Sequence, residues 1–141
     1  MHRSQIFRAL IFSGLLFGFL SAGAAQKNKV DVFVEFQKKI SELESSLKKE
    51  SDIRKRYDLF LTRYLGLSEL RAKNPRQSET NELNMSMFME TLSYLPEKKN
   101  FQAPKCKEYK KEVSAMMKSY DEKQKEPFVE KALSVIDLIC R

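Results

Sequence analysis

Two cysteines, Cys106 and Cys140, are the residues of this 141-residue chain whose chemistry and spacing are most informative about its structure. The segments on either side of residues 122–126 have helical patterns, so Cys106 begins one predicted helix and Cys140 ends the next. These arms measure roughly 24 Å and 20 Å at about 1.5 Å per residue, and folding them back on each other brings both thiols to one end. Redox pairs usually sit two residues apart, and two thiols without histidine make a poor zinc site. The spacing therefore predicts a structural disulfide between Cys106 and Cys140, with no metal ligand and no cofactor-binding residue assigned.

Histidine chemistry is excluded for nearly all of the chain, because His2 is the only histidine. His2 also lies in an N-terminal segment that we expect to be removed. The remaining chain cannot build a Ser-His-Asp or Cys-His catalytic group, nor a His-Glu-x-x-His zinc site. Gly66 would be its only glycine, so phosphate-binding loops and dinucleotide fingerprints are excluded too.

Two patterns resemble catalytic arrangements but carry little weight. Ser45-Ser46-Leu47-Lys48-Lys49 contains the Ser-x-x-Lys spacing twice, without the Lys-Thr-Gly that accompanies it in serine acylases, and we interpret it as chance. Paired carboxylates could serve a glycosidase, and a carboxylate-dependent hydrolase of envelope polysaccharide is one alternative function. Because each pair lies among lysines on a predicted solvated face, we expect no catalytic carboxyl. The candidates are Glu35, Glu42 and Glu44, or Glu108 and Glu112.

Methionines form a second cluster of interest, because thioethers bind Cu(I). Met85, Met87 and Met89 follow one another closely, and Met116 and Met117 lie further along. On a helix only Met85 and Met89 would share a face, and methionine is a common filler of helical cores. We favour core packing and keep a methionine-based copper-binding protein as the other alternative.

The N-terminal segment has the three-part layout of a secretory signal. Arg3 and Arg8 supply positive charge, an apolar run covers residues 9–20, and small residues fill positions 21–25. The run is too short to span a bilayer, which takes about 20 apolar residues. We expect cleavage after Ala24 or Ala25, giving a signal peptide at 1–24 and a single helical domain at 25–141. The protein is then exported, to the periplasm or out of the cell, with no membrane-spanning segment in its mature form.

Apolar residues in the rest of the chain recur at three- and four-residue spacing, which predicts amphipathic helices. The expected stripes are Phe33, Phe36, Ile40, Leu43 and Leu47; Ile53, Tyr57, Phe60 and Tyr64; Leu83, Met87, Phe88, Leu92 and Leu95; Cys106, Tyr109, Val113, Met116, Met117 and Tyr120; and Phe128, Ala132, Val135, Ile136 and Ile139. These tyrosines are expected in the core, with their hydroxyls reaching its rim. The alternation of Val30, Val32, Val34 and Phe36 would also fit a strand, but no partner strand is evident.

Capping and breaking residues mark the ends of these helices. Ser51 or Asp52 can cap the second helix and Gly66 is expected to end it, although one helix over residues 31–65 is an alternative. Ser78, Thr80 or Asn81 opens the third helix, and Pro96 stops it. The last helix is expected to start at Glu126-Pro127, with the proline in its first turn.

The mature chain would carry 24 basic and 19 acidic residues, a net charge of +5. We interpret this charge mainly as that of a solvated surface that keeps the protein in solution. The second interpretation is that it attracts an anionic component of the cell envelope. Nucleic acid is not an expected partner for an exported protein. The expected fold is all-α, a small bundle of four to five helices ending in a disulfide-closed antiparallel hairpin. We expect a non-enzymatic binding, adaptor or chaperone-like role with a protein partner or an anionic component, and a homodimer through the Phe33–Leu47 helix is an alternative assembly.

Overall fold

A computed structural model describes residues 30–74, 76–118 and 122–141 of the chain, without the side chains of residues 122–126. The described residues form α-helices and short 3-10 helices, and no strand occurs among them. The prediction of an all-α fold is therefore confirmed, and residues 30–36 do not form the alternative strand. The predicted signal peptide and its cleavage sites lie outside the described residues.

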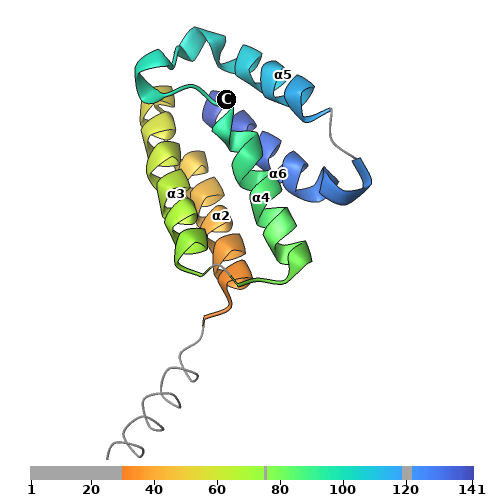
Figure 1. Cartoon of the computed structure of the whole chain (residues 1–141). Helices are drawn as coiled ribbons and strands as arrows, with labels where there is room; N and C mark the ends of the chain where they lie inside the picture. Colours follow the sequence, from red (N-terminus) through yellow and green to blue (C-terminus); the bar gives the residue numbers. More distant parts are fainter. Residues whose placement is uncertain (1–29, 75, 119–121) are drawn as a thin grey trace, which may run out of the picture. The chain divides into compact units, whose positions relative to one another are not determined.

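The compact unit Val32–Arg141 contains five α-helices within its described residues. In chain order the elements are α2 (Val32–Lys49), α3 (Ile53–Lys73), α4 (Glu79–Ser93), η1 (Lys98–Asn100), η2 (Ala103–Lys105), α5 (Cys106–Met117) and α6 (Glu122–Cys140). Helices α2 and α3 run side by side in opposite directions, and α6 contacts each of the other four helices (Figure 1). Helix α5 packs mainly on α6, so it lies at the edge of the bundle.

Side-chain caps fix two of the helix starts that the sequence predicts. The carboxylate of Asp52 accepts a hydrogen bond from the main-chain N–H of Lys55 at 2.9 Å and so caps α3. The hydroxyl of Ser78 accepts one from the N–H of Asn81 at 3.3 Å and caps α4. Each cap satisfies a donor that has no partner within its helix. The chain therefore breaks before Asp52, and the alternative of one continuous helix is wrong.

The predicted end of α3 at Gly66 is wrong, because the helix continues to Lys73. No described glycine has a positive φ, so Gly66 does not serve as a left-handed cap. Leu67 is fully buried just beyond it, and Leu70 packs against the core one turn further on. Burial of these side chains outweighs the roughly 1 kcal/mol by which glycine disfavours a helix interior.

The last helix begins earlier than predicted, at Glu122 rather than at Glu126-Pro127. Pro127 therefore lies inside α6 instead of in its first turn. The first four N–H groups of any helix lack an intrahelical acceptor, so a proline close behind them removes few hydrogen bonds. Its position near the start of a long helix is tolerated for that reason.

The predicted apolar stripes of α2 and α6 form the centre of the core. Phe36, Ile40, Leu43 and Leu47 are each 0% exposed, and α2 is covered by α3, α4 and α6. Phe33 is only half-buried and packs on Phe128 of α6, with 5.8 Å between the ring centroids. The stripe proposed as a dimer face is thus occupied within one chain, and a second copy could reach it only by displacing another helix.

Candidate functional site

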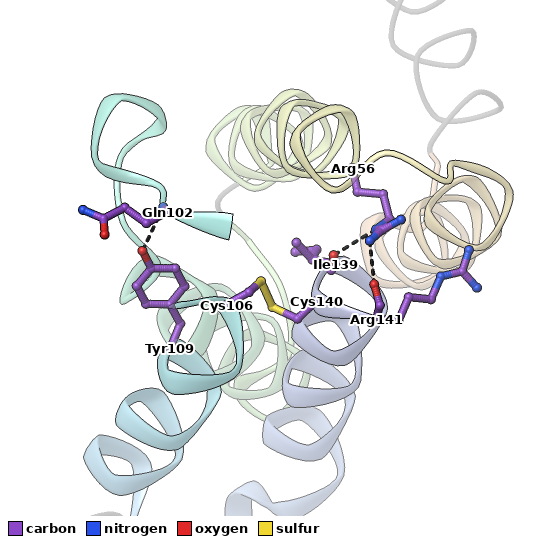
Figure 2. The surroundings of a disulfide bond; sticks show 7 residues. All are labelled: Arg56, Gln102, Cys106, Tyr109, Ile139, Cys140 and Arg141. Atoms are coloured by element: carbon purple, nitrogen blue, oxygen red, sulfur yellow. Dashed lines mark hydrogen bonds between the residues drawn. A yellow bond between two sulfur atoms is a disulfide. The ribbon is translucent and has the colours of Figure 1, made fainter. Parts of the chain in front are cut away.

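The predicted disulfide between Cys106 and Cys140 is present and closes the α5–α6 hairpin (Figure 2). The Cα atoms of the two cysteines lie 5.3 Å apart, within the range usual for this bond. Cys106 is the first residue of α5 and Cys140 the last of α6, so the bond joins the two helices where the hairpin opens. The described residues contain no free cysteine.

Arg56 of α3 is a buried charged residue beside the disulfide, and it was not among the residues singled out from the sequence. Its guanidinium donates from Nε to the main-chain oxygen of Ile139 at 2.9 Å and from Nη2 to that of Arg141 at 2.8 Å. Nη1 donates to the main-chain oxygens of Glu50 at 3.0 Å and Ser51 at 2.7 Å. One side chain thus joins the carboxyl ends of α2 and α6, where helix dipoles favour positive charge (Figure 2).

The sequence held a weak signal for this role. Arg56 is three residues after Ile53 and four before Phe60, so it falls on the apolar stripe of α3 rather than on its outer face. Only 3% of the residue is exposed. A charged residue at such a position needs nearby acceptors, and here main-chain carbonyls supply them.

Aromatic side chains hold the segment between α4 and α5 against the bundle. Phe101 stacks on Tyr57, with ring centroids 3.8 Å apart and planes 7° apart. The hydroxyl of Tyr57 donates to the main-chain oxygen of Pro96, and burial raises the pKa of Tyr57. The hydroxyl of Tyr109 accepts a hydrogen bond from the N–H of Gln102 at 3.0 Å (Figure 2). Tyr57 has its expected place, with the ring in the core and the hydroxyl at the rim, while the predicted stripe residue Tyr120 lies outside the described residues.

The methionines that could bind copper are part of the core. Met85, Met87 and Met89 are all at most 6% exposed, although Met87 projects from a different side of α4 than Met85 and Met89. Helix α4 is covered by α2, α5 and α6, so it is buried around more of its surface than one stripe predicts. The hydroxyl of Tyr64 donates to the main-chain oxygen of Met89 at 3.3 Å, and burial raises the pKa of Tyr64. Met117 is buried as well, whereas Met116 is 47% exposed.

The candidate acid–base and nucleophilic residues lie toward solvent. Glu42 is paired with Arg63 at 3.9 Å, and Glu35 with Lys39 at 3.9 Å. The other candidates, Glu44, Glu108, Glu112, Ser45, Ser46, Lys48 and Lys49, are half-buried or exposed. Among the described residues, no group of three or more His, Cys, Asp or Glu side chains is placed to hold a metal ion.

Positive charge is concentrated in the segment from Glu97 to Lys118. The unit Val32–Arg141 has 22 basic and 18 acidic residues; seven of the basic and three of the acidic ones lie in this segment, which leaves fifteen of each elsewhere. The net charge of +4 on the unit thus arises within one fifth of its length. The seven are Lys98, Lys99, Lys105, Lys107, Lys110, Lys111 and Lys118.

Four of these lysines form one side of α5, which we call the lysine flank and define as Lys107, Lys110, Lys111 and Lys118. At about 100° per residue, these positions and the small residues Ser114 and Ala115 share one side of the helix. Glu112 lies off this side, whereas Glu108, three residues before Lys111, borders it. A hollow of about 310 Å³ is lined by the last three lysines of the flank together with Ser114 and Ala115. The flank is therefore shallowly hollowed beside its last three lysines, and neither Glu108 nor Glu112 lines the hollow.

Most of the flank is uncompensated by acidic partners. The Nζ of Lys110 pairs with Asp137 of α6 at 2.6 Å, whereas Lys107, Lys111 and Lys118 form no ion pair within the described residues. Comparison of the chain with protein-family models, with curated proteins and with solved structures found no match. No helix within the described ranges is long and apolar enough to cross a membrane.

Proposed function

We propose that this chain is an exported, non-enzymatic binding protein that takes an anionic component of the cell envelope on the surface between Glu97 and Lys118. The observation that carries the proposal is the separation of charge, because this one segment accounts for the whole positive excess of Val32–Arg141. Clustered positive charge raises the local concentration of anions and the rate at which they associate.

Export is supported by the N-terminal segment and by the cysteine pair. Residues 1–25 combine basic, apolar and small-residue regions in the order of a secretory signal. Disulfides persist in oxidising compartments and are rare in the cytosol, so the bonded Cys106 and Cys140 favour an exported protein.

Binding is favoured over catalysis by the surroundings of the candidate catalytic groups. A catalytic carboxyl needs burial or a like-charged neighbour to adjust its pKa, and the candidate glutamates are at least partly exposed, two of them paired with basic residues. The methionine alternative is disfavoured because the sulfur-bearing side chains of α4 fill the core.

The binding part of the proposal is tested by removing charge at two matched places. Lys105, Lys107 and Lys111 are exposed lysines of the proposed surface, and their replacement by glutamine lowers the net charge by three. The control replaces three exposed lysines elsewhere, Lys38, Lys55 and Lys73, and lowers the net charge equally. Both variants and the native protein are titrated with polygalacturonate, inorganic polyphosphate and vesicles rich in anionic phospholipid.

We expect the native protein to bind at least one of these probes in a salt-sensitive manner. The first variant should lose at least about tenfold in affinity, since each surface lysine near an anionic ligand contributes about 1 kcal/mol, and the control less than about twofold. Equal losses in both variants, or no binding of the native protein at low salt, would contradict the proposal. N-terminal sequencing of protein recovered from the cell exterior or periplasm should start at Ala25 or Gln26, and a chain starting at Met1 in the cytosol would contradict export.

A further inference from the structure

We infer that the ligand is an extended linear polyanion that lies along the axis of α5 and seats one of its acidic groups in the hollow of the lysine flank. This inference rests on the proposed function and names the chemistry of the ligand. Polymers that carry carboxylate groups and polymers that carry phosphate groups both present a row of acidic groups. Titration with both kinds of polymer shows which of the two the protein binds.

The charges of the lysine flank follow one another along the axis of the helix. Lys107 and Lys118 are eleven residues apart, which corresponds to about 16 Å along the helix axis, and Lys110 and Lys111 lie between them. A single small anion could contact only part of such a row. A chain whose acidic groups recur about once per helical turn, near 5.4 Å, can instead follow it and meet several ammonium groups in succession.

A shallow hollow lies toward the carboxyl-terminal end of the row. It has a volume of about 310 Å³, and Lys110, Lys111 and Lys118 line it together with Ser114 and Ala115. The small side chains leave room beside the helix, and the Ser114 hydroxyl can donate a hydrogen bond to an acidic oxygen. A carboxylate or phosphate group that projects from a polymer chain can enter this open hollow and meet the three lysines that line it.

The lysine flank lacks the side chains by which proteins insert into lipid surfaces or recognise nucleic-acid bases. It has no large apolar side chain, and the exposed Met116 lies on another side of α5, so the flank has none of the apolar anchors that helices insert into lipid surfaces. It has no aromatic ring on which a base could stack and no guanidinium for bidentate recognition. Lysine side chains of this kind recognise the spacing of charges along a chain rather than one particular chemical group.

Asp137 sits at the edge of the flank and provides a test in which binding should increase. Its carboxylate pairs with Lys110 and offsets part of the positive charge that faces the ligand. Asp137→Asn removes that offset, and we expect affinity to rise about two- to fivefold, as the loss of one charge contact in water implies. Glu42→Gln changes the net charge equally on α2, far along the chain from the flank, and should leave the affinity unchanged.

The experiment uses the full chain with its disulfide intact. Oligogalacturonates and polyphosphates of increasing length, together with orthophosphate and anionic phospholipid vesicles, are titrated at several salt concentrations. We expect affinity for one polymer type to rise with length until the chain covers about 16 Å, with weak binding of orthophosphate. In Lys107→Gln/Lys111→Gln the slope of log affinity against log salt should fall by about two, or one per lysine, and Lys38→Gln/Lys55→Gln should retain the native slope.

The outcomes separate this inference from the proposed function. Binding that is independent of polymer length, or is seen with vesicles only, or falls equally in both double variants, overturns the linear-polyanion inference while anion binding itself stands. A failure of Asp137→Asn to exceed Glu42→Gln overturns the placement on the lysine flank. No binding of any anionic probe at low salt overturns both.

Discussion

Replacement of Arg56 by methionine tests whether one buried guanidinium holds together the end of the bundle that carries the disulfide. Methionine is long and apolar, so it can fill much of the same space without donating a hydrogen bond. The substitution removes four hydrogen bonds to the main-chain oxygens of Glu50, Ser51, Ile139 and Arg141. It also frees the carboxyl ends of α2 and α6 from their common partner.

The expected size of the effect follows from burial. A buried hydrogen bond from a charged donor contributes about 1.5–3 kcal/mol, which applies to the bond from Nε to Ile139. The three bonds from Nη1 and Nη2 are partly buried, and water can replace them in part, so each is expected to contribute about 0.5–1 kcal/mol. Because the variant no longer buries a charge, its folded state avoids a desolvation cost of about 1 kcal/mol, which offsets part of the loss. We therefore expect the free energy of unfolding to fall by about 2–5 kcal/mol.

Urea unfolding of the oxidised protein measures this loss. The free energy of unfolding of a small protein falls by about 1–3 kcal/mol per molar urea, so the midpoint of unfolding should fall by at least about 0.7 M. Arg54→Met is the matched control, because Arg54 is exposed on the same helix and its loss should change stability by less than about 0.5 kcal/mol. If Arg56→Met loses no more than Arg54→Met, Arg56 does not hold these ends together and the reasoning from its hydrogen bonds is refuted.

Three further predictions concern stability. Replacing Cys106 and Cys140 by serine should lower the free energy of unfolding by about 3–4 kcal/mol, the loop entropy of a 34-residue separation, and equal midpoints for the oxidised protein and the variant would contradict this. Gly66→Ala should raise it by about 0.5–1 kcal/mol, because a Cβ at this helical position meets no atom within 4 Å; a lower melting temperature would contradict this prediction. Burial raises the pKa of Tyr57, so above about pH 10 an unfolded chain ionises this tyrosine while the folded one does not. The free energy of unfolding should therefore fall as the pH rises beyond about 10. In chemical unfolding measured across that pH range, Tyr57→Phe should make this fall less steep. If the dependence of the unfolding free energy on pH is the same in the variant, Tyr57 is not its cause.

Features that depend on neighbours in the sequence were predictable. The apolar stripes of α2 and α6, the cap at Asp52 and the partnership of Cys106 with Cys140 all follow from spacing along a helix. Gly66 and Pro127 were misjudged for a common reason. Local propensity marks both as boundaries, and packing of the residues around them against other helices extends α3 and α6 past them.

The contacts around the candidate site could not be predicted from the sequence, because they join residues that are far apart along the chain. Arg56 bonds to Ile139 and Arg141, which are 83 and 85 positions away, so no local pattern could identify its partners. The side of α5 that carries the lysines can be drawn from helical spacing alone. Its hollow and the pairing of Lys110 with Asp137 depend on how α5 lies against α6, which only the structure supplies.

The lysine flank is held in place by the disulfide end of the bundle, through the disulfide, α6 and Arg56. Helix α5 has only twelve residues and buries just Cys106, Val113 and Met117, too little for a helix of this length to hold its place alone. The disulfide ties α5 to the end of α6, and Arg56 ties that same end to α2 and α3 by bonding to the residues on either side of Cys140. Reduction of the disulfide leaves every lysine charge in place but loosens the helix that aligns them. A ligand recognised by net charge would be insensitive to that change, whereas a linear polyanion recognised by a fixed row of charges requires the bond to stay closed.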